Sequence, residues 1–181
     1  MSALELSALA APERRSQTVE APTVAALAEA TAGLWLLGAS GAVGVASTEL
    51  MPQVVPGVWA VAVATFALTG PSFLVAHQYL DHRSPPQEVA NAVALGYAAM
   101  GVAAGGFSPF VLLFATTSGQ WFSALSIAVA LSGMIGLSRV RTALVQVDPE
   151  LHALARAWVL LAGAVALRLA ADVAWTLGGA A

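Results

Sequence analysis

A run of fifty residues, 89–138, contains no acidic or basic side chain. One membrane-spanning helix needs about 20 residues, so this run is too long for a single crossing and suits two helices joined by a tight turn. The polar segment 116–120, with the sequence TTSGQ, is the expected turn. The run therefore predicts a helical hairpin inside a membrane.

The composition of the whole chain agrees with this reading. Of 181 residues, 59% are hydrophobic and 9% are charged, whereas about a quarter of the residues in a soluble domain are charged. We therefore predict an all-α, polytopic transmembrane helix bundle of five spans. Residues 1–23 are expected to form a mobile polar N-terminal tail. Residues 24–181 form the transmembrane domain, with spans at about 29–48, 58–80, 89–115, 121–138 and 154–177.

The positions of the arginines predict the orientation. The chain has no lysine and seven arginines, and six of these fall in the tail or in the segments 81–88 and 138–156. Cytoplasmic segments are enriched in Lys and Arg, so we expect the N-terminus inside and the C-terminus outside. The six residues are Arg14, Arg15, Arg83, Arg139, Arg141 and Arg156. The alternative is four spans, with the last helix lying in the interface.

The seventh arginine, Arg168, lies inside the last apolar run, four residues before Asp172. A charge at this depth is costly unless it finds a partner or water, and the i, i+4 spacing lets the two side chains meet on one helix face. Two interpretations stay open. The residues form either a polar path for a proton or anion, or an ion pair that fixes helix packing or docks a partner subunit.

Prolines and glycines mark the helix interiors. Gly70-Pro71 and Ser108-Pro109 interrupt the second and third spans, where we expect kinks. Broken helices can also frame transporter sites. Small residues let helices approach closely in lipid, and the candidates for such packing are Gly38, Gly41, Gly101 and Gly105.

The start of the last helix and the tryptophans give further expectations. Asp148 is placed to cap this helix and Pro149 suits its first turn. Tryptophans near the expected span ends fit an aromatic belt at the membrane surface, and these are Trp59, Trp121, Trp158 and Trp175.

Several kinds of chemistry have no support. The chain has no cysteine, a net charge of −3 and no nucleotide-binding motif, so we expect neither nucleic-acid binding nor a bound cofactor. His77, Asp81 and His82 gather near one span end, where a solvated interface cluster is the expected role and a metal site the lesser alternative. We predict that the protein is not an enzyme.

A resemblance extends over about residues 58–141. Gly70-Pro71-Ser72-Phe73 and Gly106-Phe107-Ser108-Pro109, followed by Leu113-Phe114 and Thr116-Thr117, resemble a pattern in small multipass bacterial membrane proteins. The five-span layout with an inner N-terminus is similar to that of the Yip-type membrane domain. This resemblance implies a non-enzymatic, membrane-organising or accessory role.

Taken with the absence of catalytic motifs, these features predict a non-enzymatic integral protein of the bacterial inner membrane. It would act through helix packing, as an accessory subunit or a scaffold, with the lipid bilayer and a second copy or another membrane protein as partners. The alternative is a small oligomeric transporter or channel with its polar path at Arg168 and Asp172. The abundance of Ala and Arg, without Lys, suggests a GC-rich bacterial genome.

Overall fold

The computed structural model describes residues 20–45, 51–80 and 85–178. Within these residues the fold is all-α and has no strand. Five helices are each long and apolar enough to cross a membrane, as the sequence predicts. They are α2 (Val24–Ala42), α3 (Met51–Tyr79), α4 (Pro86–Thr117), α5 (Trp121–Val147) and α6 (His152–Gly178), and a 3-10 turn, η1 (Pro149–Leu151), leads into α6.

The first two helices begin before the spans expected from the sequence. Helix α2 starts five residues before the predicted residue 29, because the Thr23 hydroxyl caps it by accepting a 3.1 Å hydrogen bond from the Ala26 N–H. Helix α3 starts at Met51 rather than residue 58 and includes Pro52 and Pro56. Proline is tolerated in a first helical turn, where the missing N–H has no intrahelical partner, so Pro52 does not delay the helix.

Helix α5 is also longer than its expected span. Helix α5 continues nine residues past the predicted end at 138 and includes both Arg139 and Arg141. Its 27 residues extend about 40 Å, which is longer than a hydrocarbon layer of about 30 Å. The C-terminal part of α5, which carries these arginines, can therefore extend beyond that layer. The predicted cap of the following turn is confirmed, since the Asp148 carboxylate accepts a 2.9 Å hydrogen bond from the Glu150 N–H.

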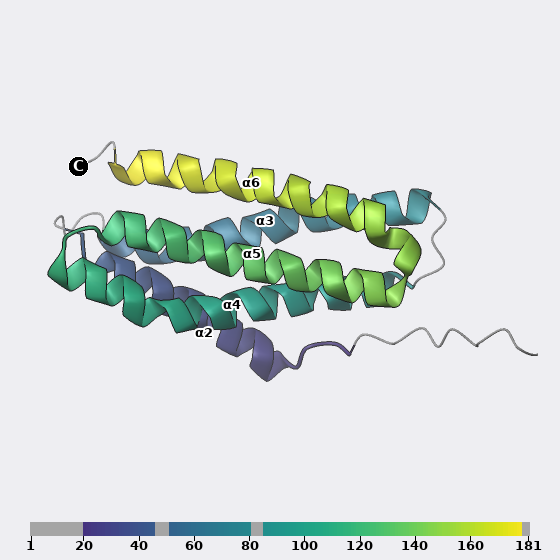
Figure 1. The fold of residues 1–181 in the computed structure, drawn as a ribbon, viewed down its shortest axis with the longest axis horizontal. Helices are drawn as coiled ribbons and strands as arrows, with labels where there is room; N and C mark the ends of the chain where they lie inside the picture. The colour runs from purple at the N-terminus through teal and green to yellow at the C-terminus, as the bar shows by residue number, and fades with distance from the viewer. Residues whose placement is uncertain (1–19, 46–50, 81–84, 179–181) are drawn as a thin grey trace, which may run out of the picture.

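The helices run alternately up and down the bundle (Figure 1) and form a closed ring of neighbours. In order around the ring, α2 packs on α4, α4 on α5, α5 on α6, α6 on α3, and α3 on α2. Gly119, with φ of 68°, makes the tight turn between α4 and α5. Helix α6 lies along α5 and α3 rather than across the end of the bundle, as the five-span arrangement requires.

Glycines allow the closest helix contacts. A Cβ at Gly101 on α4 would fall on the Ala30 backbone of α2, and one at Gly33 would fall on the Gly101 carbonyl. Helices α4 and α5 approach in the same way where Gly96 faces Gly136. Side chains larger than hydrogen cannot fit at these points, so glycine sets the spacing of α2, α4 and α5.

The other three glycines singled out in the sequence lie at helix contacts too. A Cβ at Gly38 would lie 2.8 Å from the Val55 Cα of α3, and one at Gly41 would lie 2.8 Å from the Leu125 Cδ2 of α5. A Cβ at Gly105 would lie 3.3 Å from the Gly33 Cα. All three face neighbouring helices.

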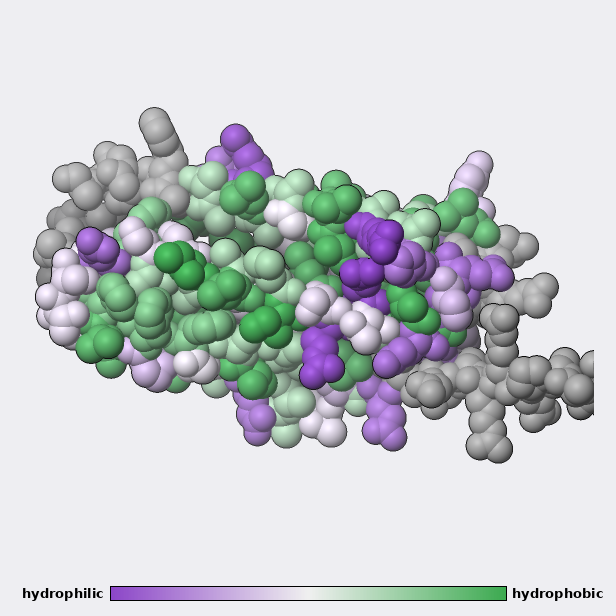
Figure 2. Space-filling model, in the orientation of Figure 1, coloured by the Kyte–Doolittle hydropathy of each residue, from purple (hydrophilic) through white to green (hydrophobic). Residues whose placement is uncertain are grey.

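Hydrophilic residues gather toward the end of the bundle where α5 ends and α6 begins (Figure 2), and apolar side chains cover most of the remaining visible surface. Arg139, Arg141 and Arg156 belong to this end, at the close of α5 and the start of α6. Arg14 and Arg15 lie outside the described residues, as does Arg83. The inward orientation of this end stays a prediction.

Candidate functional site

The structure brings Arg168 and Asp172 together on α6. They lie one helical turn apart, with 3.1 Å between the Arg168 Nη2 and the Asp172 Oδ1 atoms. Their side chains are 78% and 55% exposed, so both charges face away from the other helices of the chain. An ion pair in this position is available to a neighbouring molecule.

The position of Arg168 along α6 places it within the apolar layer of a five-span arrangement. It lies 12 residues after Arg156 and 10 residues before Gly178, the last residue of the helix. At a rise of 1.5 Å per residue these separations are about 18 Å and about 15 Å. A charged residue at the centre of a membrane helix costs about 2.5–3.5 kcal/mol on insertion scales. Pairing with Asp172 offsets part of this cost.

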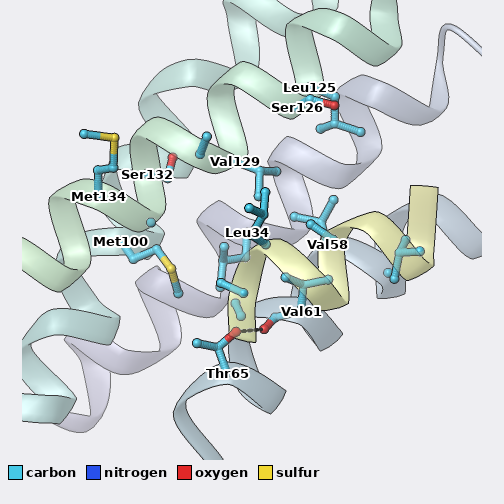
Figure 3. Close-up of a pocket in the computed structure, with 18 of the residues that line it drawn as sticks. Leu34, Val58, Val61, Thr65, Met100, Leu125, Ser126, Val129, Ser132 and Met134 are labelled. Carbon is cyan, nitrogen blue, oxygen red and sulfur yellow. Dashed lines mark hydrogen bonds between the residues drawn. The ribbon is translucent and has the colours of Figure 1, made fainter. Parts of the chain in front are cut away.

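A separate cavity of about 550 Å³ lies inside the ring of helices (Figure 3), lined mainly by α3, α5 and α6. We call it the α5–α6 groove, because the exposed residues of its wall all belong to these two helices. They are Phe122, Ser126, Ala130, Met134, Leu167 and Ala171. The buried residues of its floor come from the other helices as well, such as Leu34, Val58 and Met100.

The wall of the groove is almost wholly apolar. The residues that line it include no acidic, basic or histidine side chain, and its polar groups are the hydroxyls of Thr65, Ser126 and Ser132. Thr65 donates a 2.7 Å hydrogen bond to the Val61 carbonyl of its own helix (Figure 3). Such a wall suits a hydrocarbon chain and offers no charged group to an ion. Arg168 and Asp172 do not line it.

The two proline sites lie inside continuous helices. Helix α3 passes through Gly70-Pro71 and α4 passes through Ser108-Pro109. In α4 the Ser108 hydroxyl donates a 2.7 Å hydrogen bond to the Gly105 carbonyl. An α-helix would pair this oxygen with the N–H of residue 109, which proline lacks, so the serine replaces the missing donor.

His77 is buried near the end of α3, and its ring lies 6.5 Å from that of Phe73 between centroids. It is therefore not a solvated interface residue, as the sequence suggested, because α3 turns this position into the bundle. Asp81 and His82 lie outside the described residues. Among the residues that are described, no group of acidic or histidine side chains is arranged to hold a metal ion.

Trp158 plays a part that sequence reasoning missed. The sequence predicted only that it lies near a span end; in the structure it is 3% exposed and packs against Phe66 and Phe73 of α3. Its indole N–H donates a 2.9 Å hydrogen bond to the Thr69 carbonyl. Trp158 lies almost two turns after the start of α6 at His152, on the side of the helix that faces α3.

Comparison with known proteins adds no identity. No family model, curated protein or solved structure matches this chain. The resemblance to the Yip-type membrane domain stays a prediction.

Proposed function

We propose that this chain is a non-enzymatic integral membrane protein that acts through helix packing, as an accessory subunit or a membrane-organising scaffold. The observation that carries the proposal is the outward direction of Arg168 and Asp172, which are 78% and 55% exposed. Charges inside a membrane normally face a bundle interior, a water-filled cavity or a partner. Here they face out of their own bundle, which supports a docking role.

The alternative role, a transporter or channel, gains less support. A polar path through one chain would need polar or charged residues along an internal cavity. The α5–α6 groove has three hydroxyl-bearing residues in its wall and no charged one. A path at Arg168 and Asp172 would have to run between subunits, so it too would require assembly.

The test is the mass of the particle extracted from native membranes in a mild detergent. The chain has a mass of 18.3 kDa, and we expect the wild-type particle to contain more protein than one chain. The variant that combines Arg168→Leu and Asp172→Leu should keep its helical circular dichroism and fall to the monomer mass. A wild-type chain that is monomeric both in the extract and after crosslinking in the membrane contradicts the proposal.

The same variant separates the alternative role. A transporter should lose flux through reconstituted vesicles while its particle mass stays unchanged, whereas an accessory subunit or scaffold should lose its partner.

A further inference from the structure

One face of α6 is built to meet another helix. Ala157, Leu161, Ala164, Arg168 and Asp172 follow one another at spacings of four, three, four and four residues, so they share one side of the helix. All five are exposed in the chain. We call this surface the α6 outer face. Its two alanines lie seven residues apart, and small side chains at such positions allow two helices to approach closely in lipid.

The charges on this face are complementary to themselves. A base and an acid lie one turn apart, with 3.1 Å between Nη2 and Oδ1. A guanidinium has five N–H donors and a carboxylate accepts from several directions, so each group can serve a second partner. A face of only one sign would need a different protein to neutralise it. This one is matched by its own rotated copy.

We propose that the α6 outer face binds the same face of a second copy, in a parallel two-fold dimer in which Arg168 of each chain pairs with Asp172 of the other. The inference rests on the proposed function and names the partner. A two-fold axis along the membrane normal keeps equivalent residues at equal depth. The reach that this requires of Arg168 is one helical turn, which it already spans to Asp172 in its own chain.

The two-fold arrangement also places opposite charges next to each other across the dimer interface. Arg168 and Asp172 lie about 40° apart around the helix axis, since four residues turn an α-helix by slightly more than one full revolution. When two such faces meet about a two-fold axis, the side that carries the base in one chain lies opposite the side that carries the acid in the other. The result is a ring of four alternating charges that leaves no guanidinium facing lipid.

The absence of cysteine from the chain makes a direct test possible in native membranes. Single variants Ala157→Cys, Leu161→Cys and Ala164→Cys are oxidised and examined for a product of twice the mass. Val102→Cys, at an exposed position of α4, is the matched control. We expect disulfide-linked dimers from the α6 variants, at about ten times the yield of the control.

Charge exchange then tests the ionic contact. The variant Arg168→Asp carries two acids on the face and Asp172→Arg carries two bases, so each alone should lose the dimer. When the two variants are produced together under different tags, they should copurify, and the chain with both changes should dimerise like the wild type. This rescue separates loss of the interface from loss of folding.

The results distinguish the two proposals. Crosslinks from the α6 outer face to a different protein alone would overturn the second copy as partner but leave the accessory role intact. No crosslink of any kind from this face, as expected if lipid headgroups satisfied the charges, would overturn both. Dimers that form without charge specificity would overturn the exchanged ion pairs.

Discussion

At the scale of single residues, the contact between Gly101 and Ala30 shows how far the packing of this bundle depends on glycine, which has no side chain. The backbones of α2 and α4 meet there, and a Cβ on Gly101 would overlap the Ala30 main chain. Gly106, just over one turn further along α4, is exposed, and a Cβ there would meet no heavy atom within 4 Å. The same helix therefore offers a site that cannot accept a methyl group and a matched site that can.

We expect Gly101→Ala to destabilise the protein by about 1–3 kcal/mol, because the two helices must separate to admit the methyl group. Gly106→Ala should be neutral or stabilising by up to about 1 kcal/mol, since alanine favours the helix. Thermal unfolding in detergent, followed by circular dichroism, measures the stability of both variants. Equal melting temperatures for the two variants would show that the close contact between α4 and α2 does not make Gly101 intolerant of a methyl group.

Some residue-scale features were readable from the sequence and others were not. The cap by Asp148 was predictable because it depends on neighbours in the chain. The hydrogen bond from Trp158 to Thr69 spans 89 positions in sequence, and no local pattern reports which face of α6 meets α3. The pairing of Arg168 with Asp172 followed from helix geometry, but their outward direction required the packed bundle.

At the scale of helices, α4 contains a local repair. Pro109 removes the N–H that would bind the Gly105 carbonyl, and the Ser108 hydroxyl takes its place at 2.7 Å. In lipid no water can replace a lost donor. The helix therefore continues through the proline while the Gly105 carbonyl oxygen keeps a hydrogen bond.

We expect Ser108→Ala to cost about 1–3 kcal/mol, because a buried acceptor loses its hydrogen bond. In the Pro109→Ala background the same change should cost less, since an alanine at that position supplies the N–H that proline lacks. A four-variant thermodynamic cycle measured by unfolding in detergent gives the coupling between the two positions. A cost of Ser108→Ala that is the same in both backgrounds would mean that the hydroxyl does not compensate for the proline.

The number and order of the helices were predictable, whereas their ends were not. Apolar runs of about 20 residues identify the spans. Helix α5, however, continues through Arg139 and Arg141. The backbone hydrogen bonds of a helix can continue beyond the apolar layer, so composition does not mark the end of the helix. Composition reports the membrane layer, and the termini depend on caps and turns outside it.

At the scale of the whole molecule, the ring of five neighbours follows from contacts that no single segment encodes. The arginines do predict the orientation of this ring, because those of the described residues that lie outside the apolar layer, such as Arg139 and Arg156, gather at one end. An odd number of crossings places the two termini on opposite sides of the membrane.

We expect a reporter fused to the N-terminus to be active only in the cytoplasm and one fused to the C-terminus only outside it. Adding two basic residues to the turn between α4 and α5, by Ser118→Arg with Gln120→Arg, should weaken the preference for an inner N-terminus. Alkaline phosphatase and fluorescent-protein fusions measure the two locations. Both ends in the same compartment would mean an even number of crossings.

Unequal helix lengths have a consequence for the surrounding bilayer. Helix α2 has 19 residues, about 28 Å, and it carries the exposed carboxylate of Glu29 within its second turn. It also crosses the other helices obliquely (Figure 1), which shortens its reach along the membrane normal. Thickness mismatch costs a fraction of a kcal/mol per Å. The protein should therefore thin the lipid around α2 and concentrate where the bilayer is already thin.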